Sequence, residues 1–262
     1  MVENGSKTPE FEPGKEWGFS ELQLRVKNIY EQHDLECGYG PDTTLIKLSV
    51  SALALQKLLK KADNPDAFPS INRNLTNVFI WTATFANIAD LDLQSIMEKK
   101  FGQGCPHCKQ MPCLLAKGEK CIAPLLSTEN KDMIVPPSNL EEWQKHLAKM
   151  YSNNLQGDIA KALTITSSKL IEESIELSGS SYADLLRELN EGSFQNEMLP
   201  WESEIADVLA WAFAISNCLD VKNGSYSAEK SLKEKYKDSC PYCKSPKCIC
   251  KKEKTFIEEL KK

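Results

Sequence analysis

The sequence is built from two similar halves, and this internal repeat constrains the fold more than any other feature. Four segments of the first half match four of the second in the same order: 21–30 with 142–151, 47–55 with 169–177, 77–87 with 207–217, and 105–113 with 240–248. The spacing between partners grows along the chain, as expected if the second half gained short insertions within 178–200 and around 222–226. Offsets of 121 to 135 residues between partners are far too long for a solenoid, so they indicate a duplicated domain of about 100 residues.

Each half is predicted to fold into four helices. Apolar residues recur at helical spacing, as at Leu22, Val26, Ile29 and Tyr30. The expected helices cover 20–33, 43–61, 72–89 and 92–101 in the first half, and 139–153, 157–178, 200–219 and 226–237 in the second. No clear strand alternation is visible. We therefore expect an all-α protein of two tandem helical-bundle units.

The sequence also suggests where these units begin and end. The expected segments are a flexible N-terminus over 1–18, a first unit over 19–121, a linker over 122–138, a second unit over 139–250, and a C-terminal tail over 251–262. Pro124, Pro136 and Pro137 support the linker, because proline interrupts helices.

Five carboxylates occur within two apolar helical segments of the second half. They are Glu172, Glu173 and Glu176 in KLIEESIEL, and Glu204 and Asp207 in WESEIADVLAW. Residues three or four positions apart share a helix face, so these side chains are expected to meet where the two helices pack together. Such a cluster repels itself unless a cation neutralises it, and carboxylate oxygens favour Mg²⁺, Mn²⁺ or Ca²⁺. A solvated acidic helix face is the alternative interpretation.

Only one half carries these carboxylates. Positions 172, 173 and 176 correspond to Val50, Ser51 and Ala54 of the first half, while positions 204 and 207 correspond to Asn74 and Asn77. The apolar residues around them are kept in both halves. The second half is therefore predicted to hold metal, and the first half is not.

These motifs resemble the EExxE and ExxD signature of the all-α nucleoside triphosphate pyrophosphohydrolases, and MazG-like members most closely. The resemblance covers the second half and, weakly, the first, from about residue 19 to 250. It implies Mg²⁺-dependent (or Mn²⁺-dependent) cleavage of a nucleoside triphosphate, or its deoxy form, to the monophosphate and pyrophosphate. It also implies that two helical units build one site. Here the repeat would supply both as an intramolecular pseudo-dimer with a degenerate first copy.

The resemblance further implies roles for particular residues. Glu173 or Glu176 would activate the attacking water. Lys235 is the expected phosphate contact, with Lys100 as its counterpart in the first half, and Asn217 is an expected contact to base or sugar. A surface lysine and a helix-end amide are the alternatives for Lys235 and Asn217. The implied magnesium ligands are Glu172, Glu173, Glu176, Glu204 and Asp207.

Eight of the ten cysteines gather in two short clusters, one at the end of each half. The second consists of Cys240, Cys243, Cys248 and Cys250. The first contains Cys105, Cys108 and Cys113, with either Cys121 or His107 as a fourth ligand. A CxxC turn followed by further cysteines is typical of a structural zinc knuckle with four thiolates. A redox dithiol and a disulfide are the alternatives for these clusters.

Charge and hydropathy exclude several classes of partner. The formal net charge is −5 and no basic stripe is visible, so a nucleic-acid partner is not expected. No apolar run approaches the roughly 20 residues that a membrane span requires. The N-terminal residues are polar and lack the apolar core of a signal peptide, so we expect a cytoplasmic protein. A homodimer is compatible with such bundles, although no residue indicates one.

Two functions from other classes remain open on the sequence. One is a non-hydrolytic nucleotide-binding or regulatory protein that keeps the metal ligands without turnover. The other is an interaction module that uses its zinc knuckles. The complete set of five carboxylates favours the hydrolase, and the substrate base and sugar are not determined.

Overall fold

The computed structural model describes residues 16–113, 121, 134–152, 157–179, 198–237 and 239–250. Within these ranges the chain is helical and has no strand, which confirms the predicted all-α class. Most of the expected N-terminal segment, linker and tail lies outside the described residues, as does most of the insertion within 178–200. The helices are α1 (Phe19–Cys37), α2 (Pro41–Leu59), α3 (Phe68–Ile88), α4 (Leu93–Phe101), α5 (Leu140–Met150), α6 (Ile159–Gly179), α8 (Pro200–Asn223) and α9 (Ala228–Tyr236).

Local capping explains where these helices begin and end. Helix α1 continues beyond the predicted residue 33 and stops at Gly38, whose φ of 68° is a left-handed conformation that glycine adopts at low cost. Helix α3 begins earlier than predicted, because the side chain of Asn64 accepts a hydrogen bond from Asp66 N–H and starts a short 3₁₀ turn that leads into it.

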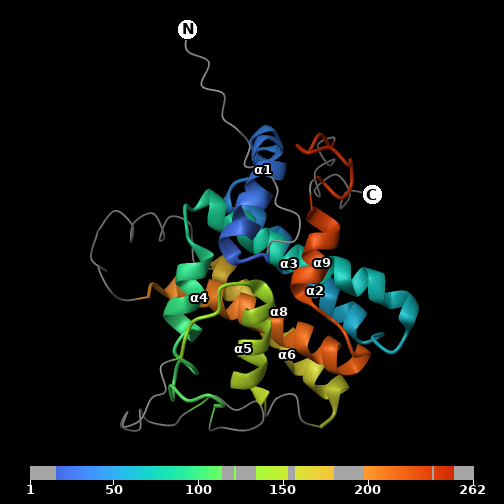
Figure 1. Cartoon of the computed structure of the whole chain (residues 1–262). Helices are drawn as coiled ribbons and strands as arrows, with labels where there is room; N and C mark the ends of the chain where they lie inside the picture. The colour runs from blue at the N-terminus through green and yellow to red at the C-terminus, as the bar shows by residue number, and fades with distance from the viewer. Residues whose placement is uncertain are drawn as a thin grey trace.

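The central packing joins the two halves of the sequence. Helix α2 packs along α3, α6 packs along α8, and α2 and α6 pack against each other (Figure 1). At that contact Ser49 Oγ donates to the Ser174 carbonyl at 3.2 Å, and Gln56 Nε2 donates to Ser168 Oγ at 3.0 Å. Short hydroxyl side chains allow the two helices to approach closely. Helix α2 of the first half therefore lies beside α6 of the second half.

One hydrophobic core serves both halves. Phe19 of α1 lies 6.2 Å, between ring centroids, from Trp143 of α5 and from Phe213 of α8. The rings of Phe213 and Phe79 of α3 lie 5.0 Å apart. These four aromatic side chains are fully buried. Because apolar burial is the main stabilising contribution to folding, neither half is expected to be stable with its share of this core exposed.

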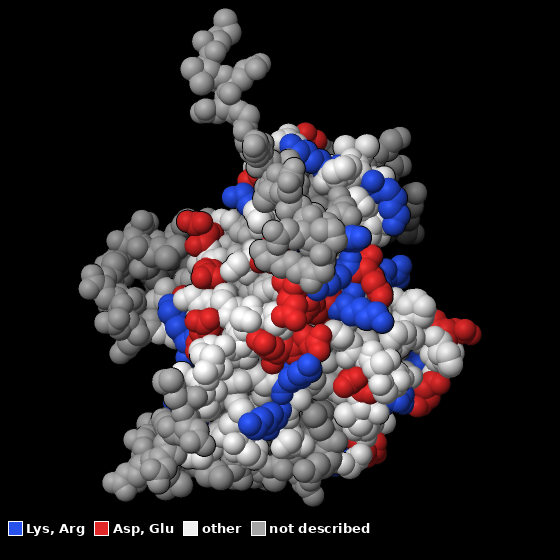
Figure 2. All heavy atoms as spheres, in the orientation of Figure 1, with Lys and Arg blue, Asp and Glu red and all other residues white. Residues whose placement is uncertain are grey.

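No helix in the described ranges is long and apolar enough to cross a membrane. Figure 2 shows one face of the molecule, on which acidic and basic side chains are mixed and several acidic side chains gather near the middle.

Candidate metal centres

Three of the five predicted carboxylates come together between α6 and α8. One carboxylate oxygen from each of Glu173, Glu204 and Asp207 lies within 4.8 Å of the others. Glu173 is on α6, while Glu204 and Asp207 are one turn apart on α8, so the packing of these helices creates the group. We call Glu173, Glu204 and Asp207 the carboxylate centre.

Burial and mutual repulsion disfavour the charged forms of the carboxylate centre. Partial burial and the neighbouring carboxylates Glu204 and Asp207 raise the pKa of Glu173 from its usual 4.5 to about 8. Burial also raises the pKa of Asp207, although the Lys100 ammonium opposes this rise. Oε2 of Glu204 is buried and accepts no hydrogen bond from the described residues. An unpartnered buried oxygen is costly, and a cation would offset that cost.

The other two predicted ligands lie at the edge of this group or outside it. Glu176 is more exposed, but its charge helps to raise the pKa values of Glu173 and Asp207, so it lies close to the centre. Glu172 is exposed and accepts hydrogen bonds at 2.6 and 2.7 Å from Lys169 on the same helix. Glu172 therefore makes an ion pair on the helix surface away from the group.

A lysine from the first half reaches the carboxylate centre. Lys100 Nζ on α4 donates to Asp207 Oδ2 at 2.5 Å, to Ser203 Oγ at 2.6 Å and to the Ser203 carbonyl at 3.0 Å. Its side chain is only 12% exposed, so the ion pair with Asp207 is shielded from solvent. The first half, which lacks the carboxylates, thus contributes a cationic group to the centre of the second.

Lys235, the predicted phosphate contact, lies elsewhere. Its ammonium donates to Asn77 Oδ1 and Thr76 Oγ1, each at 3.0 Å, and to the Arg73 carbonyl at 3.2 Å, all on α3. Burial lowers the pKa of Lys235 to about 8. Asn77 is the first-half counterpart of Asp207, so Lys235 occupies the place that corresponds to Lys100. The sequence shows that the two lysines correspond. It does not show that each lysine reaches into the opposite half of the molecule.

Asn217, the predicted base or sugar contact, has a structural partner. Its side-chain N–H₂ donates to the Gln144 carbonyl at 3.2 Å. Gln144 in turn donates to the Tyr226 carbonyl at 3.1 Å and accepts from Ala228 N–H at 2.9 Å, which ties α5 to the start of α9. Both Asn217 and Gln144 are buried.

The first half repeats this arrangement with equivalent residues. Asn87 donates to the Gln23 carbonyl at 2.9 Å, and Gln23 donates to the Leu91 carbonyl at 2.7 Å and accepts from Leu93 N–H at 3.0 Å. Since the first half lacks the carboxylates but keeps the bonds, the asparagine serves to hold helices together in both halves.

The two groups of cysteines form compact thiol clusters. In each cluster all four sulfur atoms lie within 4.8 Å of one another, a spacing that can hold a metal ion such as zinc. All ten cysteines are described and none forms a disulfide. The first thiol cluster consists of Cys105, Cys108, Cys113 and Cys121. The second thiol cluster consists of Cys240, Cys243, Cys248 and Cys250.

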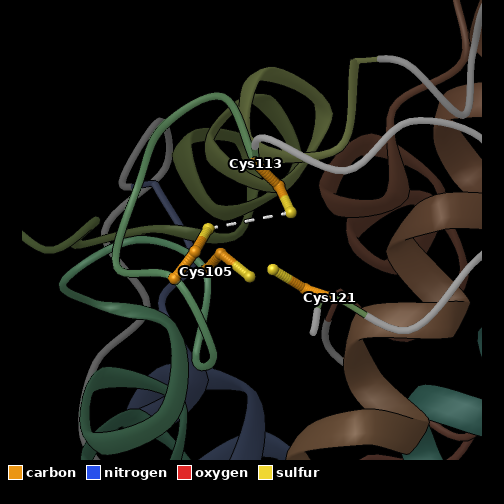
Figure 3. Close-up of side chains that lie close together, drawn as sticks. Cys105, Cys113 and Cys121 are labelled. Carbon is orange, nitrogen blue, oxygen red and sulfur yellow. Dashed lines mark hydrogen bonds between the residues drawn. The ribbon is translucent and has the colours of Figure 1, made fainter. Parts of the chain in front are cut away.

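The first thiol cluster takes its fourth sulfur from Cys121, which was one of two sequence candidates. Figure 3 shows Cys105, Cys113 and Cys121 directing their sulfur atoms toward one another. The sulfur atoms of Cys108 and Cys113 lie 3.9 Å apart. His107 is exposed and does not belong to the group of four.

Both clusters are built on the same turn. Lys109 N–H donates to the Cys105 carbonyl at 2.8 Å, and Lys244 N–H donates to the Cys240 carbonyl at 2.9 Å. Lys109 and Lys244 have φ values of 54° and 59°. In the second cluster, backbone N–H groups lower the pKa of Cys243 to about 6, so this sulfur is ionised at neutral pH and ready to bind metal.

A separate open pocket of about 640 Å³ lies between the α2–α3 and α8–α9 connections. Its charged lining residues are Asp63, Lys222, Lys230 and Glu234, which balance one another in sign. The residues of the carboxylate centre do not line it. This pocket therefore gives no independent indication of a ligand class.

The chain matches no protein-family model, no curated protein and no solved structure. The all-helical fold is compatible with a MazG-like protein. The resemblance to that superfamily rests on the sequence motifs alone, and the chemistry of the site follows from the residues themselves.

Proposed function

We propose that the protein is a Mg²⁺-dependent nucleotide pyrophosphohydrolase of the MazG-like type. The observation that carries this proposal is the carboxylate centre, in which Glu204 Oε2 is buried and has no hydrogen-bond partner among the described residues, while burial and the neighbouring carboxylates raise the pKa of Glu173 to about 8. Hard oxygen donors in a crowded, partly buried group fit Mg²⁺ or Mn²⁺. The donor set thus agrees with the metal that the sequence resemblance implies.

The residues present have distinct roles in the proposed reaction. Glu173, Glu204 and Asp207 would hold the cation, with Glu176 close enough to join them. A divalent cation there would offset the negative charge of the phosphate oxygens during cleavage. Lys100 is the available ammonium group for a phosphate oxygen, since it already lies against Asp207. Glu173 or Glu176, once ionised, would accept a proton from the attacking water.

The site is proposed to lie within an intramolecular pseudo-dimer. Reciprocal contacts between the halves support this arrangement. Lys100 of α4 reaches α8, while its counterpart Lys235 of α9 reaches α3. Cys113 N–H donates to the Met150 carbonyl at 2.8 Å. The first half would then act as a wall of the site without chemistry of its own, apart from Lys100.

The two thiol clusters are proposed to hold structural zinc. Four thiolates close a tetrahedral zinc site and leave no position for substrate. Each cluster follows the last helix of its half and docks on a helix of the other half. The first docks on the end of α5 at Met150, and the second on the middle of α1 at Ile29. Zinc there would therefore fix the contact between the halves.

Product analysis with purified protein, Mg²⁺ and a panel of ribonucleoside and deoxyribonucleoside triphosphates tests the proposed function. We expect pyrophosphate and a monophosphate from the wild type. The variant Glu173→Gln should lose this activity, and Glu31→Gln, at an exposed ion pair on α1, should keep it. If neither the wild type nor either variant releases pyrophosphate from any nucleotide of the panel, the proposed hydrolase activity is contradicted.

One observation favours a second candidate, an interaction module built on the second thiol cluster. Tyr242 and Ile249 are 63% and 73% exposed at that cluster. Apolar side chains displayed on a rigid knuckle are suited to contact another protein. Loss of a binding partner in a variant with Tyr242→Ser and Ile249→Ser, at unchanged hydrolysis, would establish this role.

A further inference from the structure

The first thiol cluster lies beside the carboxylate centre. Helix α4 provides the most direct link, because its last turn carries Lys100, which contacts Asp207 at 2.5 Å. The helix ends at Phe101, and Cys105 follows after a short turn. Any movement of the cluster is thus transmitted to Lys100 through only a few residues of backbone.

The end of α5 provides a second link. Cys113 N–H donates to the Met150 carbonyl at 2.8 Å, which docks the cluster on this helix. The next residue, Tyr151, is partly buried, and the charges of Cys105 and Asp207 both add to the rise in its pKa. The phenol therefore lies within electrostatic range of both the thiol cluster and the carboxylate centre.

A contact between α4 and α5 provides a third link. Nε2 of His146 on α5 lies within hydrogen-bond distance, 2.9 Å, of the Phe101 carbonyl, at the end of α4. The three links therefore join the last turn of α4, the first thiol cluster and the end of α5.

The second thiol cluster serves as an internal control, because it has the same turn and the same number of cysteines as the first. Its turn has the same hydrogen bonds, and Cys248 N–H donates to the Ile29 carbonyl of α1 at 2.7 Å. However, the lysine of the adjoining helix, Lys235, reaches the amide of Asn77, where the first half has no carboxylate. The second cluster therefore borders a site without metal ligands.

We propose that the first thiol cluster is a positioning site for the carboxylate centre, so that zinc bound to its four sulfur atoms strengthens divalent-cation binding by Glu173, Glu204 and Asp207. The inference rests on the proposed metal centre. Zinc would lock the turn, the end of α4 that brings Lys100 to Asp207, and the end of α5 on which Cys113 docks. Groups that orient metal ligands from outside commonly change metal affinity by about 10–100-fold. The second thiol cluster, by contrast, would stabilise the fold without affecting the carboxylates.

The test compares Mn²⁺ binding, followed by electron paramagnetic resonance, in matched variants of the full chain. Cys108→Ser with Cys113→Ser empties the first cluster, and Cys243→Ser with Cys248→Ser empties the second. Zinc content should fall from about two to about one ion per chain in each. We expect Mn²⁺ affinity to fall at least about tenfold in the first variant and to stay within about twofold in the second.

Milder variants keep the test decisive if a double variant does not fold, as judged by helical circular dichroism. Cys121→Ser and Cys250→Ser each remove one sulfur and leave three. Only Cys121→Ser should weaken Mn²⁺ binding. Equal Mn²⁺ affinity in both members of a folded pair would overturn the inference. If the wild type and Glu173→Gln bind Mn²⁺ equally weakly, the proposed metal centre itself fails, which is a distinguishable result.

Discussion

Adjacent glutamates in α6 have different surroundings, and this difference can be tested one residue at a time. Glu173 belongs to the carboxylate centre, whereas Glu172 pairs with Lys169 on the exposed face. We expect Glu173→Gln to reduce pyrophosphate release by about 100-fold or more, because several kcal/mol of charge stabilisation depend on the cation. Glu172→Gln should change the rate by about twofold at most, as for an exposed ion pair.

Initial rates at saturating Mg²⁺ would check this prediction, with zinc content and thermal melting as controls for folding. An equal loss of activity in both variants would mean that Glu172 also acts at the centre. The sequence alone treats the two glutamates alike, since both fit the EExxE motif.

The pH dependence of cation binding follows from the raised pKa of Glu173. Its carboxyl must ionise to bind metal, and its pKa in the metal-free protein is about 8. Protons therefore compete with the cation below pH 8. The apparent Mn²⁺ affinity should rise by about tenfold per pH unit toward pH 8 and then level off. Calorimetric titrations between pH 6 and 9 would check this, and Glu173→Gln should abolish the slope.

The same pKa shift predicts how metal-free protein responds to pH. Glu173 binds its proton more tightly in the folded chain than in the unfolded chain, so ionisation destabilises the fold. The free energy of unfolding should fall as pH rises from about 4.5 to about 8, and divalent cation should restore it. Urea unfolding with and without Mg²⁺ at several pH values would measure the effect. A metal-free protein with pH-independent stability over this range would contradict the assignment.

Asn217 is expected to affect stability and not substrate binding. Its buried hydrogen bond to the Gln144 carbonyl holds α8 on α5, so Asn217→Ala should cost about 1–3 kcal/mol of unfolding free energy. Asn87→Ala, which removes the equivalent bond in the first half, should cost a similar amount. Urea unfolding of both variants would check this. A higher KM for nucleotide in Asn217→Ala alone, at unchanged stability, would restore its predicted role as a substrate contact.

At the scale of helices, the short last helix of each half reaches into the other half through one lysine. Lys100 of α4 and Lys235 of α9 make matching sets of hydrogen bonds, but only Lys100 meets a carboxylate. Lys100→Met and Lys235→Met should each destabilise the fold by about 1–3 kcal/mol. Only Lys100→Met should also reduce hydrolysis, by about tenfold or more.

Parallel measurements of urea unfolding and pyrophosphate release would separate the two effects. Retained activity in Lys100→Met would show that this lysine only holds helices together, as Lys235 does. If Lys235→Met loses activity although the variant remains folded, Lys235 is the phosphate contact, as the sequence suggested.

At the scale of the whole molecule, the shared core predicts that the second half is not an independent domain. Residues 139–250 alone would expose the face of α6 that α2 covers and the face of Phe213 that packs on Phe19 and Phe79. We expect this fragment to be unfolded or to form a homodimer, which light scattering and circular dichroism would distinguish. A stable, folded monomer would contradict the shared core.

Much of this architecture could be predicted from the sequence, because its signals are local. Apolar periodicity located the helices to within a few residues. The boundaries that moved most are the ends of α1 and α8, which continue to the left-handed glycines Gly38 and Gly224, and the start of α3. The gathering of Glu173, Glu204 and Asp207 follows from helical spacing on two neighbouring helices. The compact thiol clusters follow from the CxxC turn, although the choice of Cys121 over His107 required the fold.

What the sequence determined by itself was the all-helical class, the repeat, and the residue types that can bind metal. Only the tertiary structure decided which residues of one half contact the site of the other half. It brought Lys100, and not Lys235, to the carboxylates, turned Glu172 away, and docked the first thiol cluster on the end of α5. The physical reason is that these contacts join segments far apart in the chain. Local propensity does not encode such contacts, which arise when two similar halves bury their apolar faces against each other.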